Sequence, residues 1–159
     1  MTFSVAGRCA RTGALGVVIS SSSPAVAARC AYVRAGVGAV TTQNVTDPRL
    51  GPALLAALAA GDNAASAVAR VAQTSESAGY RQLTAVDTAG GAAAFTGVHA
   101  LGAHGDLVGE GCVAAGNLLA DVDVLAACVD AFAASASQDL EERLVRALEA
   151  GLGLSLIHI

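Results

Sequence analysis

Hydrophobic and polar positions alternate at the start of the chain, a pattern that is typical of a half-buried β-strand. In the segment 2–8, Phe3 and Val5 would point to one face of a sheet, and the small residues beside them to the other. The turn signal at residues 11–13 and the β-branched run that follows it predict a hairpin. The same criteria predict further strands at residues 15–22, 37–43, 80–88, 92–97 and 112–115.

Helical periodicity replaces this alternation in two regions, and each region is predicted to hold a pair of helices. Asp47 and Pro48 are expected to cap and begin the first helix, whose leucines line one face up to Gly61. Asp62 or Asn63 is expected to cap the next helix. The second pair is predicted at residues 121–136 and 139–150, after a predicted glycine-rich loop at 98–111.

The order of these segments is strands, two helices, strands and two helices again. This order favours an α+β fold with antiparallel sheet layers and helices outside them. A chain of 159 residues, of which 54% are apolar, is expected to form one domain with a sizeable core. Charged residues make up only 14%, which argues against disorder.

Charge and aromatic content exclude several classes of partner. The net charge is −4, and all nine basic residues are arginines that form no cluster, so no nucleic-acid partner is expected. Aromatic residues make up 3% of the chain, too few for a platform that stacks bases. The longest near-apolar stretch, residues 52–60, is much shorter than the roughly 18 residues of a membrane-spanning helix, so no membrane partner is expected either.

The cysteines and histidines have no spacing that is typical of a metal or redox site. We expect the cysteines to be buried in a reducing cytoplasm, without a disulfide or zinc, because no CxxC pair occurs. His99 and His104 are five residues apart in the predicted loop, which is a poor metal signature. No metal or cofactor is therefore predicted, and the expected location is cytoplasmic. The cysteines are Cys9, Cys30, Cys112 and Cys128.

The main candidate for chemistry is Thr2, which removal of Met1 would expose at the N-terminus. Thr2 is small enough for cellular methionine removal. An N-terminal threonine carries its own base, because its α-amino group has a pKa of about 7.7–8.0 and can accept the Oγ1 proton through a water molecule. A Met-Thr start also occurs without any catalytic role, so this alternative stays open.

Amide hydrolysis also needs hydrogen-bond donors for the developing oxyanion. Asn117 is the candidate donor, because its amide is neutral and Gly116 before it allows close approach of the backbone; the alternative is a turn residue. Arg34 could hold a substrate carboxylate with two hydrogen bonds, or could be a solvated surface arginine. Polar residues at the ends of two predicted strands could orient the amine or line a pocket, or could be ordinary strand-end residues: Ser22, Ser23, Thr42 and Gln43.

Several motifs together resemble the domain-of-unknown-function 1028 family, which is placed in the N-terminal nucleophile (Ntn) hydrolase superfamily. The most specific are the segment 34–43 and the element Gly116-Asn117. The resemblance covers Thr2 to about Gly151 and implies a four-layer αββα sandwich with the nucleophile on the first strand. Weaker matches occur at residues 2–6, 13–17, 50–52, 81–83, 86–90, 96–97 and 118–120.

The last residues depart from this family pattern. We expect a single domain over residues 1–151 and a non-native or truncated tail over 152–159, which resembles a read-through of synthetic sequencing adapter. Members of the family continue into further strand at this point. The sandwich is therefore expected to lack its last strand or strands and to leave a strand edge unpaired.

These observations favour an Ntn-type amidohydrolase that cleaves a small linear or cyclic amide through Thr2, by way of an acyl-enzyme. The alternatives are a non-catalytic Ntn-fold protein that binds a small ligand or a partner, and an inactive fragment. The expected partner is a small-molecule amide, and a homo-oligomer is an option that the sequence leaves open.

Overall fold

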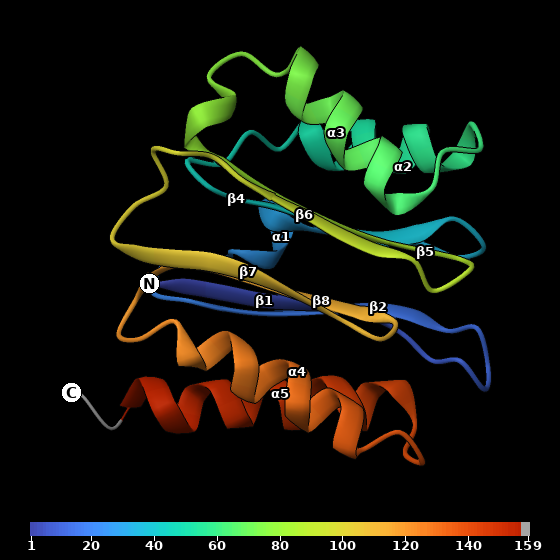
Figure 1. Cartoon of the computed structure of the whole chain (residues 1–159), viewed down its shortest axis with the longest axis vertical. Helices are drawn as coiled ribbons and strands as arrows, with labels where there is room; N and C mark the ends of the chain where they lie inside the picture. Colours follow the sequence, from blue (N-terminus) through green and yellow to red (C-terminus); the bar gives the residue numbers. More distant parts are fainter. Residues whose placement is uncertain (157–159) are drawn as a thin grey trace.

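Two antiparallel four-stranded sheets face each other at the centre of the protein (Figure 1). The computed structural model describes residues 1–156. The first sheet has the order β2-β1-β8-β7, with β1 (Thr2–Arg8), β2 (Leu15–Ser21), β7 (Ala103–Gly109) and β8 (Cys112–Leu119). The second sheet has the order β3-β4-β5-β6, with β3 (Ala31–Arg34), β4 (Gly38–Asn44), β5 (Arg81–Asp87) and β6 (Ala92–Thr96).

A pair of helices covers the outer face of each sheet, which gives the four layers seen in Figure 1. The second sheet carries α2 (Leu50–Ala59) and α3 (Ala64–Thr74), and the first carries α4 (Asp123–Ala134) and α5 (Leu140–Leu156). The connections hold the short helix α1 (Ala27–Cys30) and the 3-10 turn η1 (Ala78–Tyr80). The predicted α+β layer arrangement is thus confirmed. No helix within residues 1–156 is long and apolar enough to cross a membrane.

The side chains of β1 alternate between two faces, as the sequence predicted. Phe3 and Val5 are fully buried in the core formed with α4 and α5. Burial of such a side chain contributes about 1.5–3 kcal/mol. Ala6 points to the other sheet, where it packs against Ala39 of β4 and Val86 of β5. The layer between the sheets is therefore apolar near the C-terminal end of β1.

Two observed strands, β3 and β7, have no counterpart among the predicted ones. β3 has only four residues, and β7 lies in the segment that was predicted to be a glycine-rich loop. β7 contains Gly105 and Gly109 and is mostly exposed at the edge of its sheet, so it lacks the alternation that marks a half-buried strand. β8 is longer than predicted and reaches Leu119.

The observed helix starts agree with one predicted cap and differ at another. Asn63 caps α3, where its side-chain oxygen accepts a hydrogen bond from the amide N of Ser66 at 2.9 Å. α2 begins at Leu50, after a turn in which Asp47 Oδ1 accepts hydrogen bonds from the amide N (3.0 Å) and Nε (2.9 Å) of Arg49. Hydrogen bonds from Arg49 lower the pKa of Asp47 to about 2. The predicted cap therefore stabilises the turn before the helix.

The last helix continues past the predicted end of the domain. α5 runs to Leu156 without a break at Gly151. Gly151 lies so close to the core that a Cβ there would be 2.6 Å from Cys128 Sγ. Leu152 packs against the same core. The expected tail of residues 152–159 is thus helical as far as Leu156, and the remainder of that tail lies outside the described residues.

The four cysteines are buried and unbridged, and two of them have strongly perturbed thiols. Burial raises the pKa of Cys112 to about 11 and that of Cys128 to about 12. At pH 8, below both values, these thiols stay protonated in the folded protein, and the thiolate is the form that reacts. We therefore expect iodoacetamide to leave Cys112 and Cys128 unmodified until the protein is denatured, as peptide mass mapping would measure. Rapid labelling of either residue in the native protein would contradict this expectation, and fewer than four reactive thiols after denaturation would reveal a disulfide.

Candidate active site

Thr2 is the first residue of β1 and lies between the two neighbouring strands of its sheet. Its register partners are Ser21 on β2 and Asn117 on β8. The Thr2 Oγ1 and Ser21 Oγ atoms are hydrogen-bonded at 2.8 Å. Residues that are directly opposite in an antiparallel pair have Cβ atoms about 4.5–5.5 Å apart. The predicted proximity of Thr2 and Asn117 is therefore confirmed, and their chemical roles stay predictions.

Met1 precedes Thr2 and is held by Ser22. The amide N of Ser22 donates to the Met1 carbonyl at 3.1 Å, and the terminal amine of Met1 donates to Ser22 Oγ at 3.1 Å. The first bond makes Thr2 and Ser21 a non-hydrogen-bonded pair, in which the side chains lie close together. The amide N of Thr2 therefore faces the other neighbour, β8, where Asn117 is its partner.

A chain of buried polar side chains crosses between the two sheets at this end of β1. Asn117 Nδ2 donates to Gln82 Oε1 at 2.9 Å, and Gln43 Nε2 donates to the same oxygen at 3.3 Å. Ser4 Oγ donates to Gln43 Oε1 at 2.7 Å, and Gln82 Nε2 donates to the Gly116 carbonyl at 2.9 Å. The four side chains are at most 3% exposed, so these bonds replace the water contacts that burial removes. The network fixes the orientation of the Asn117 amide beside Thr2.

The same network continues to the edge where β6 and β7 approach each other. Gln82 Nε2 is 3.2 Å from Thr96 Oγ1 and 3.2 Å from the Gly105 carbonyl oxygen. Thr96 Oγ1 donates to Asp106 Oδ1 at 2.6 Å. Asp106 is exposed. The buried amides are thus connected to one charged group at the surface.

Left-handed backbone conformations of residues other than glycine gather at the Thr2 end of the sandwich. Leu118, directly after Asn117, has a φ of 53°, and Ala25 and Ser77 in the connections at this end have φ values of 52° and 58°. Such a conformation costs about 1–2 kcal/mol per residue. Strain of this kind clusters at functional sites, which favours this end as the active site. At the opposite ends of the sheets, the turns use glycine for the same conformation, at Gly13, Gly36, Gly90 and Gly111.

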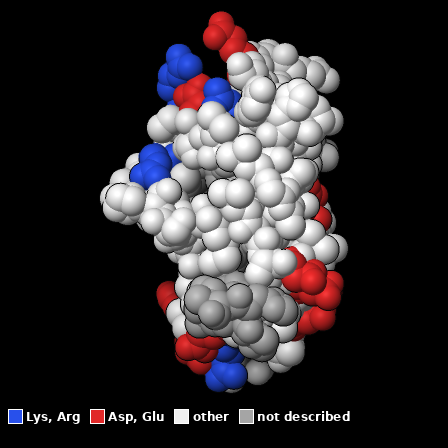
Figure 2. All heavy atoms as spheres, turned by 90° about the vertical axis from the view of Figure 1, so that its left-hand side faces the viewer, with Lys and Arg blue, Asp and Glu red and all other residues white. Residues whose placement is uncertain are grey.

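The surface at the end of the sandwich where the chain begins is largely uncharged. Figure 2 shows this face, with few charged side chains in its middle and with the acidic and basic groups towards its margins. A charged ligand that leaves water needs compensating charges, whereas a neutral amide needs only hydrogen bonds. The described part of this face therefore suits a neutral ligand better than a charged one.

Gln43 and Thr42 are neighbours on β4, and their side chains point to opposite faces of the sheet. Gln43 lies in the network between the sheets. Thr42 lies on the helix-covered face, where its Oγ1 donates to the Asp47 carbonyl at 3.3 Å. The structure therefore brings Gln43, and not Thr42, to the side on which the site lies.

The remaining predicted site residues are divided between the two ends of the sandwich. Ser22 and Ser23 lie in the bend after β2, where Ser22 binds Met1 and the Ser23 amide N is 3.1 Å from Ser21 Oγ. Arg34 is exposed at the end of β3 that points away from this site. It is not in a position to hold the carboxylate of a substrate bound here.

Sequence reasoning missed three residues that the structure places in the site, namely Ser4, Ser21 and Gln82. Gln82 is fully buried, and it interrupts a strand whose other residues are mostly apolar or small. A glutamine at a predicted core position is a signal for a buried network, because its amide must find partners there. Which partners it finds depends on the register between strands that are distant in the sequence.

Neither His99 nor His104 takes part in the described hydrogen bonds of this network. The ring of His99 lies against that of Tyr80, with 5.0 Å between the centroids. His104 Nδ1 is 2.7 Å from the Gly102 carbonyl oxygen. Among residues 1–156, no group of three or more His, Cys, Asp or Glu side chains is suited to hold a metal ion.

Comparison with known proteins identifies the family. The profile of the "Family of unknown function (DUF1028)" matches residues 2–154. The chain belongs to the DUF1028 family. The crystal structure of the DUF1028 protein SPO2555 from Silicibacter pomeroyi is similar to it, with a TM-score of 0.91 and 33% sequence identity over 96% of this chain and 70% of that one. No curated protein matches the chain.

Membership of DUF1028 confirms the family resemblance that the sequence motifs indicated. The match spans both sheets and both helix pairs, so the four layers are common to this chain and SPO2555. The description of DUF1028 assigns no reaction. The chemistry therefore has to be argued from the residues at the start of β1.

Proposed function

We propose that this DUF1028 protein is an Ntn-type amidohydrolase that cleaves a small, neutral amide through Thr2 after removal of Met1. One observation carries the proposal. Thr2 begins an inner strand of its sheet, with Asn117 paired to it on one side and the Ser21 hydroxyl bonded to it on the other. A nucleophile, its own amine and a hydrogen-bond donor are then in one place, as acyl transfer requires.

The base in this proposal is the α-amine of Thr2. Removal of Met1 converts the amide N of Thr2 into a primary amine, and an α-amine has a pKa of about 7.7–8.0. The amine takes the Oγ1 proton through a bridging water molecule while Oγ1 attacks the substrate carbonyl. The C–N bond of the substrate then breaks, the leaving amine takes up that proton, and an ester to Thr2 remains. A water molecule hydrolyses this ester and restores the hydroxyl.

Two groups are suited to stabilise the oxyanion. Asn117 Nδ2 carries two N–H groups and gives one of them to Gln82, so the second is available to a substrate. The amide N of Ser22 binds the Met1 carbonyl and loses that acceptor when Met1 is removed. An oxyanion donor of this kind contributes about 10²–10³-fold in kcat. The Ser21 hydroxyl would orient Thr2 Oγ1 for attack.

The network behind these groups supports the same function. Gln82 and Gln43 hold the Asn117 amide in place before substrate arrives, and preorganised donors act without reorganisation during the reaction. The largely uncharged surface around the chain start is consistent with a neutral amide substrate.

Methionine removal provides the test of the proposal. Intact-mass spectrometry of the protein purified from cells is expected to find Met1 absent. Protein made while methionine aminopeptidase is inhibited should retain Met1 and be inactive on a panel of linear and cyclic amides. Treatment of that protein with purified methionine aminopeptidase should then restore hydrolysis, because the amine of Thr2 is released.

Two results would contradict the proposal. Amide hydrolysis by protein that fully retains Met1 would exclude an N-terminal nucleophile. Retention of Met1 in the native protein, together with the absence of hydrolysis, would favour the alternative of a non-catalytic Ntn-fold protein that binds a ligand or a partner.

A further inference from the structure

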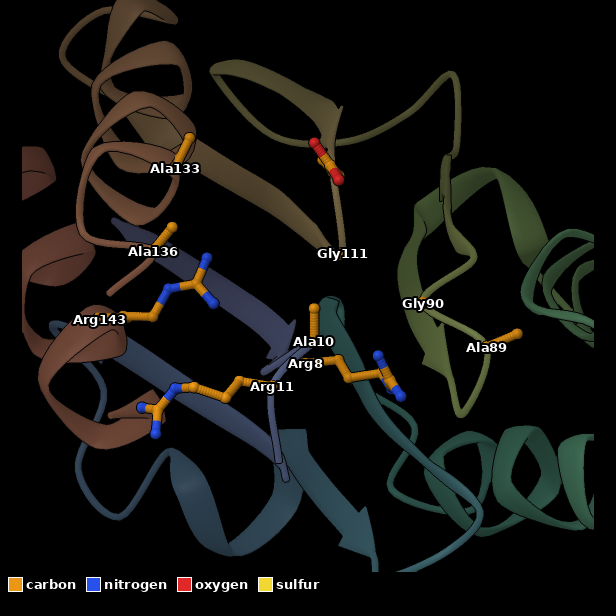
Figure 3. Close-up of a pocket in the computed structure, with 10 residues that line it drawn as sticks. Arg8, Ala10, Arg11, Ala89, Gly90, Gly111, Ala133, Ala136 and Arg143 are labelled. Atoms are coloured by element: carbon orange, nitrogen blue, oxygen red, sulfur yellow. The ribbon is translucent and has the colours of Figure 1, made fainter. Parts of the chain in front are cut away.

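A cavity of about 330 Å³ lies at the opposite end of β1 from Thr2. Arg8 at the end of β1, Arg11 in the following turn and Arg143 of α5 line it. In Figure 3, Arg143 lies on one side of the cavity, and the side chain of Arg8 points towards the turn at Ala89 and Gly90. Six residues of strand at about 3.3 Å each separate this cavity from Thr2 by roughly 20 Å. It is therefore a second site, separate from the one proposed above.

Arg143 is a buried cation without a carboxylate partner among the described residues. It is 6% exposed. Its Nε and Nη2 donate to the Phe132 carbonyl at 3.2 Å and 3.0 Å, and its Cζ lies 3.8 Å from the centre of the Phe132 ring. These contacts satisfy two of the three nitrogen atoms of the guanidinium group as hydrogen-bond donors, but they supply no negative charge. A buried charge without a counter-charge is costly, so an anion beside it would be stabilising.

Arg8, which also lines this cavity, carries a second unsatisfied group. Its Nε is buried and has no hydrogen-bond partner within residues 1–156. Its guanidinium lies between two turns: a Cβ on Gly13 would be 4.0 Å from Nη2, and a Cβ on Gly90 would be 3.9 Å from Nη1. Both turns have positive φ at these glycines, so the backbone approaches the arginine where a larger residue would be strained. The site is shaped around a cation that the described chain leaves unpaired.

The other charges at the cavity define what it can hold. Arg11 is already paired with Asp139, with 2.8 Å between Nη2 and Oδ1. Glu110 also lines the cavity and is exposed. The cavity is therefore lined by two unpaired arginines and one carboxylate. This small excess of positive charge favours an anion of low charge over a polyanion. The remaining lining residues are alanines and glycines, which leave room for a small molecule.

We propose that this cavity binds a small oxyanion, a carboxylate or a phosphate group, for which Arg8 and Arg143 supply the positive charge. Arginine is suited to this task because its planar fork can give two parallel hydrogen bonds to carboxylate or phosphate oxygens. The terminal Nη groups of Arg8 and the uncommitted Nη1 of Arg143 supply the donors.

An NMR titration tests the proposal in the wild-type protein. The chain has nine arginines and no lysine, so its spectrum of side-chain Nε–Hε groups is simple to resolve. Inorganic phosphate or succinate, added against sodium chloride of the same ionic strength, should shift the signals of Arg8 and Arg143. The same anion should raise the midpoint of thermal unfolding, because a ligand that binds only the folded state stabilises it.

Two variants locate the site. Arg8→Gln should weaken the binding about tenfold or more, because it removes a charge-assisted donor. The control Arg70→Gln removes a half-exposed arginine of α3 that is paired with Asp62 and does not line the cavity, and it should retain wild-type binding. A response to phosphate alone would assign a phosphate ligand, and a response to succinate alone would assign a carboxylate.

The proposal is overturned if neither anion has a stronger effect than chloride, or if Arg8→Gln binds the anion as tightly as the wild type does. If Arg8→Gln does not fold, the wild-type titration decides.

Discussion

Replacement of Thr2 by alanine is expected to lower the kcat for amide hydrolysis by about 10⁴-fold or more, the scale seen when a catalytic nucleophile is removed. Alanine keeps the N-terminal amine and lacks Oγ1, so the attack on the carbonyl cannot occur. Thr2→Ser is the matched control, because serine keeps both the hydroxyl and the amine, and this variant should retain part of the activity. Alanine and serine are both small enough for removal of Met1, so the two variants differ only in the nucleophile.

The stability and pH dependence of the variants help to separate chemistry from structure. The Thr2 hydroxyl makes one described hydrogen bond, to Ser21. The free energy of unfolding of Thr2→Ala should therefore lie within about 1 kcal/mol of the wild-type value. The activity of the wild type should rise with pH through the range of an α-amine, because the base must be unprotonated. Undiminished hydrolysis by the alanine variant would move the reaction to another part of the protein.

Replacement of Gln82 by alanine is expected to reduce the free energy of unfolding by about 3 kcal/mol or more. The side chain accepts hydrogen bonds from Asn117 and Gln43 and donates to the carbonyl of Gly116. Each buried polar group left without a partner costs about 1–3 kcal/mol, and the empty volume adds a further cost. Denaturant unfolding would measure this as a lower midpoint at unchanged slope.

Two further variants separate the causes of this effect. Gln82→Met restores volume without hydrogen bonds, so it should remain clearly less stable than the wild type. Gln73→Ala truncates an exposed glutamine of α3 and should change the stability by about 0.5 kcal/mol or less. If Gln82→Ala were as stable as the wild type, the groups that Gln82 binds would have formed hydrogen bonds with water or with one another. The network would then not be what holds the two sheets together.

The sequence predicts the parts of this fold that depend on local patterns. β1 alternates because one of its faces meets helices and the other meets a sheet, and the pattern of Phe3 and Val5 records that difference. Asn63 caps a helix through a contact within its own turn. The edge strand β7 leaves no such record, because it is mostly exposed and contains two glycines, whereas the edge strands β2 and β6 were predicted.

The candidate site depends on contacts that no local pattern contains. Thr42 and Gln43 are equally polar in the sequence, and the register of β4 alone decides which one reaches the layer between the sheets. Arg34 was a candidate because an arginine can bind a carboxylate with two hydrogen bonds. The unpredicted strand β3 instead carries it to the opposite end of the sandwich. The proximity of Thr2 and Asn117 was predicted from the chemistry of amide hydrolysis, which needs both residues at one carbonyl group, and not from their spacing.

The left-handed residues Ala25, Ser77 and Leu118 have a consequence for how this protein can evolve. Glycine at these positions would relieve about 1–2 kcal/mol of strain in each case. It would also make the unfolded chain more flexible, which costs about 0.5–1 kcal/mol. The relief of strain is the larger effect by about 0.5–1 kcal/mol, so selection for stability alone would favour glycine at these positions. A lineage that retains larger side chains there reveals selection on the stiffness of the backbone around the chain start, and comparison of these three positions across genomes would measure its strength.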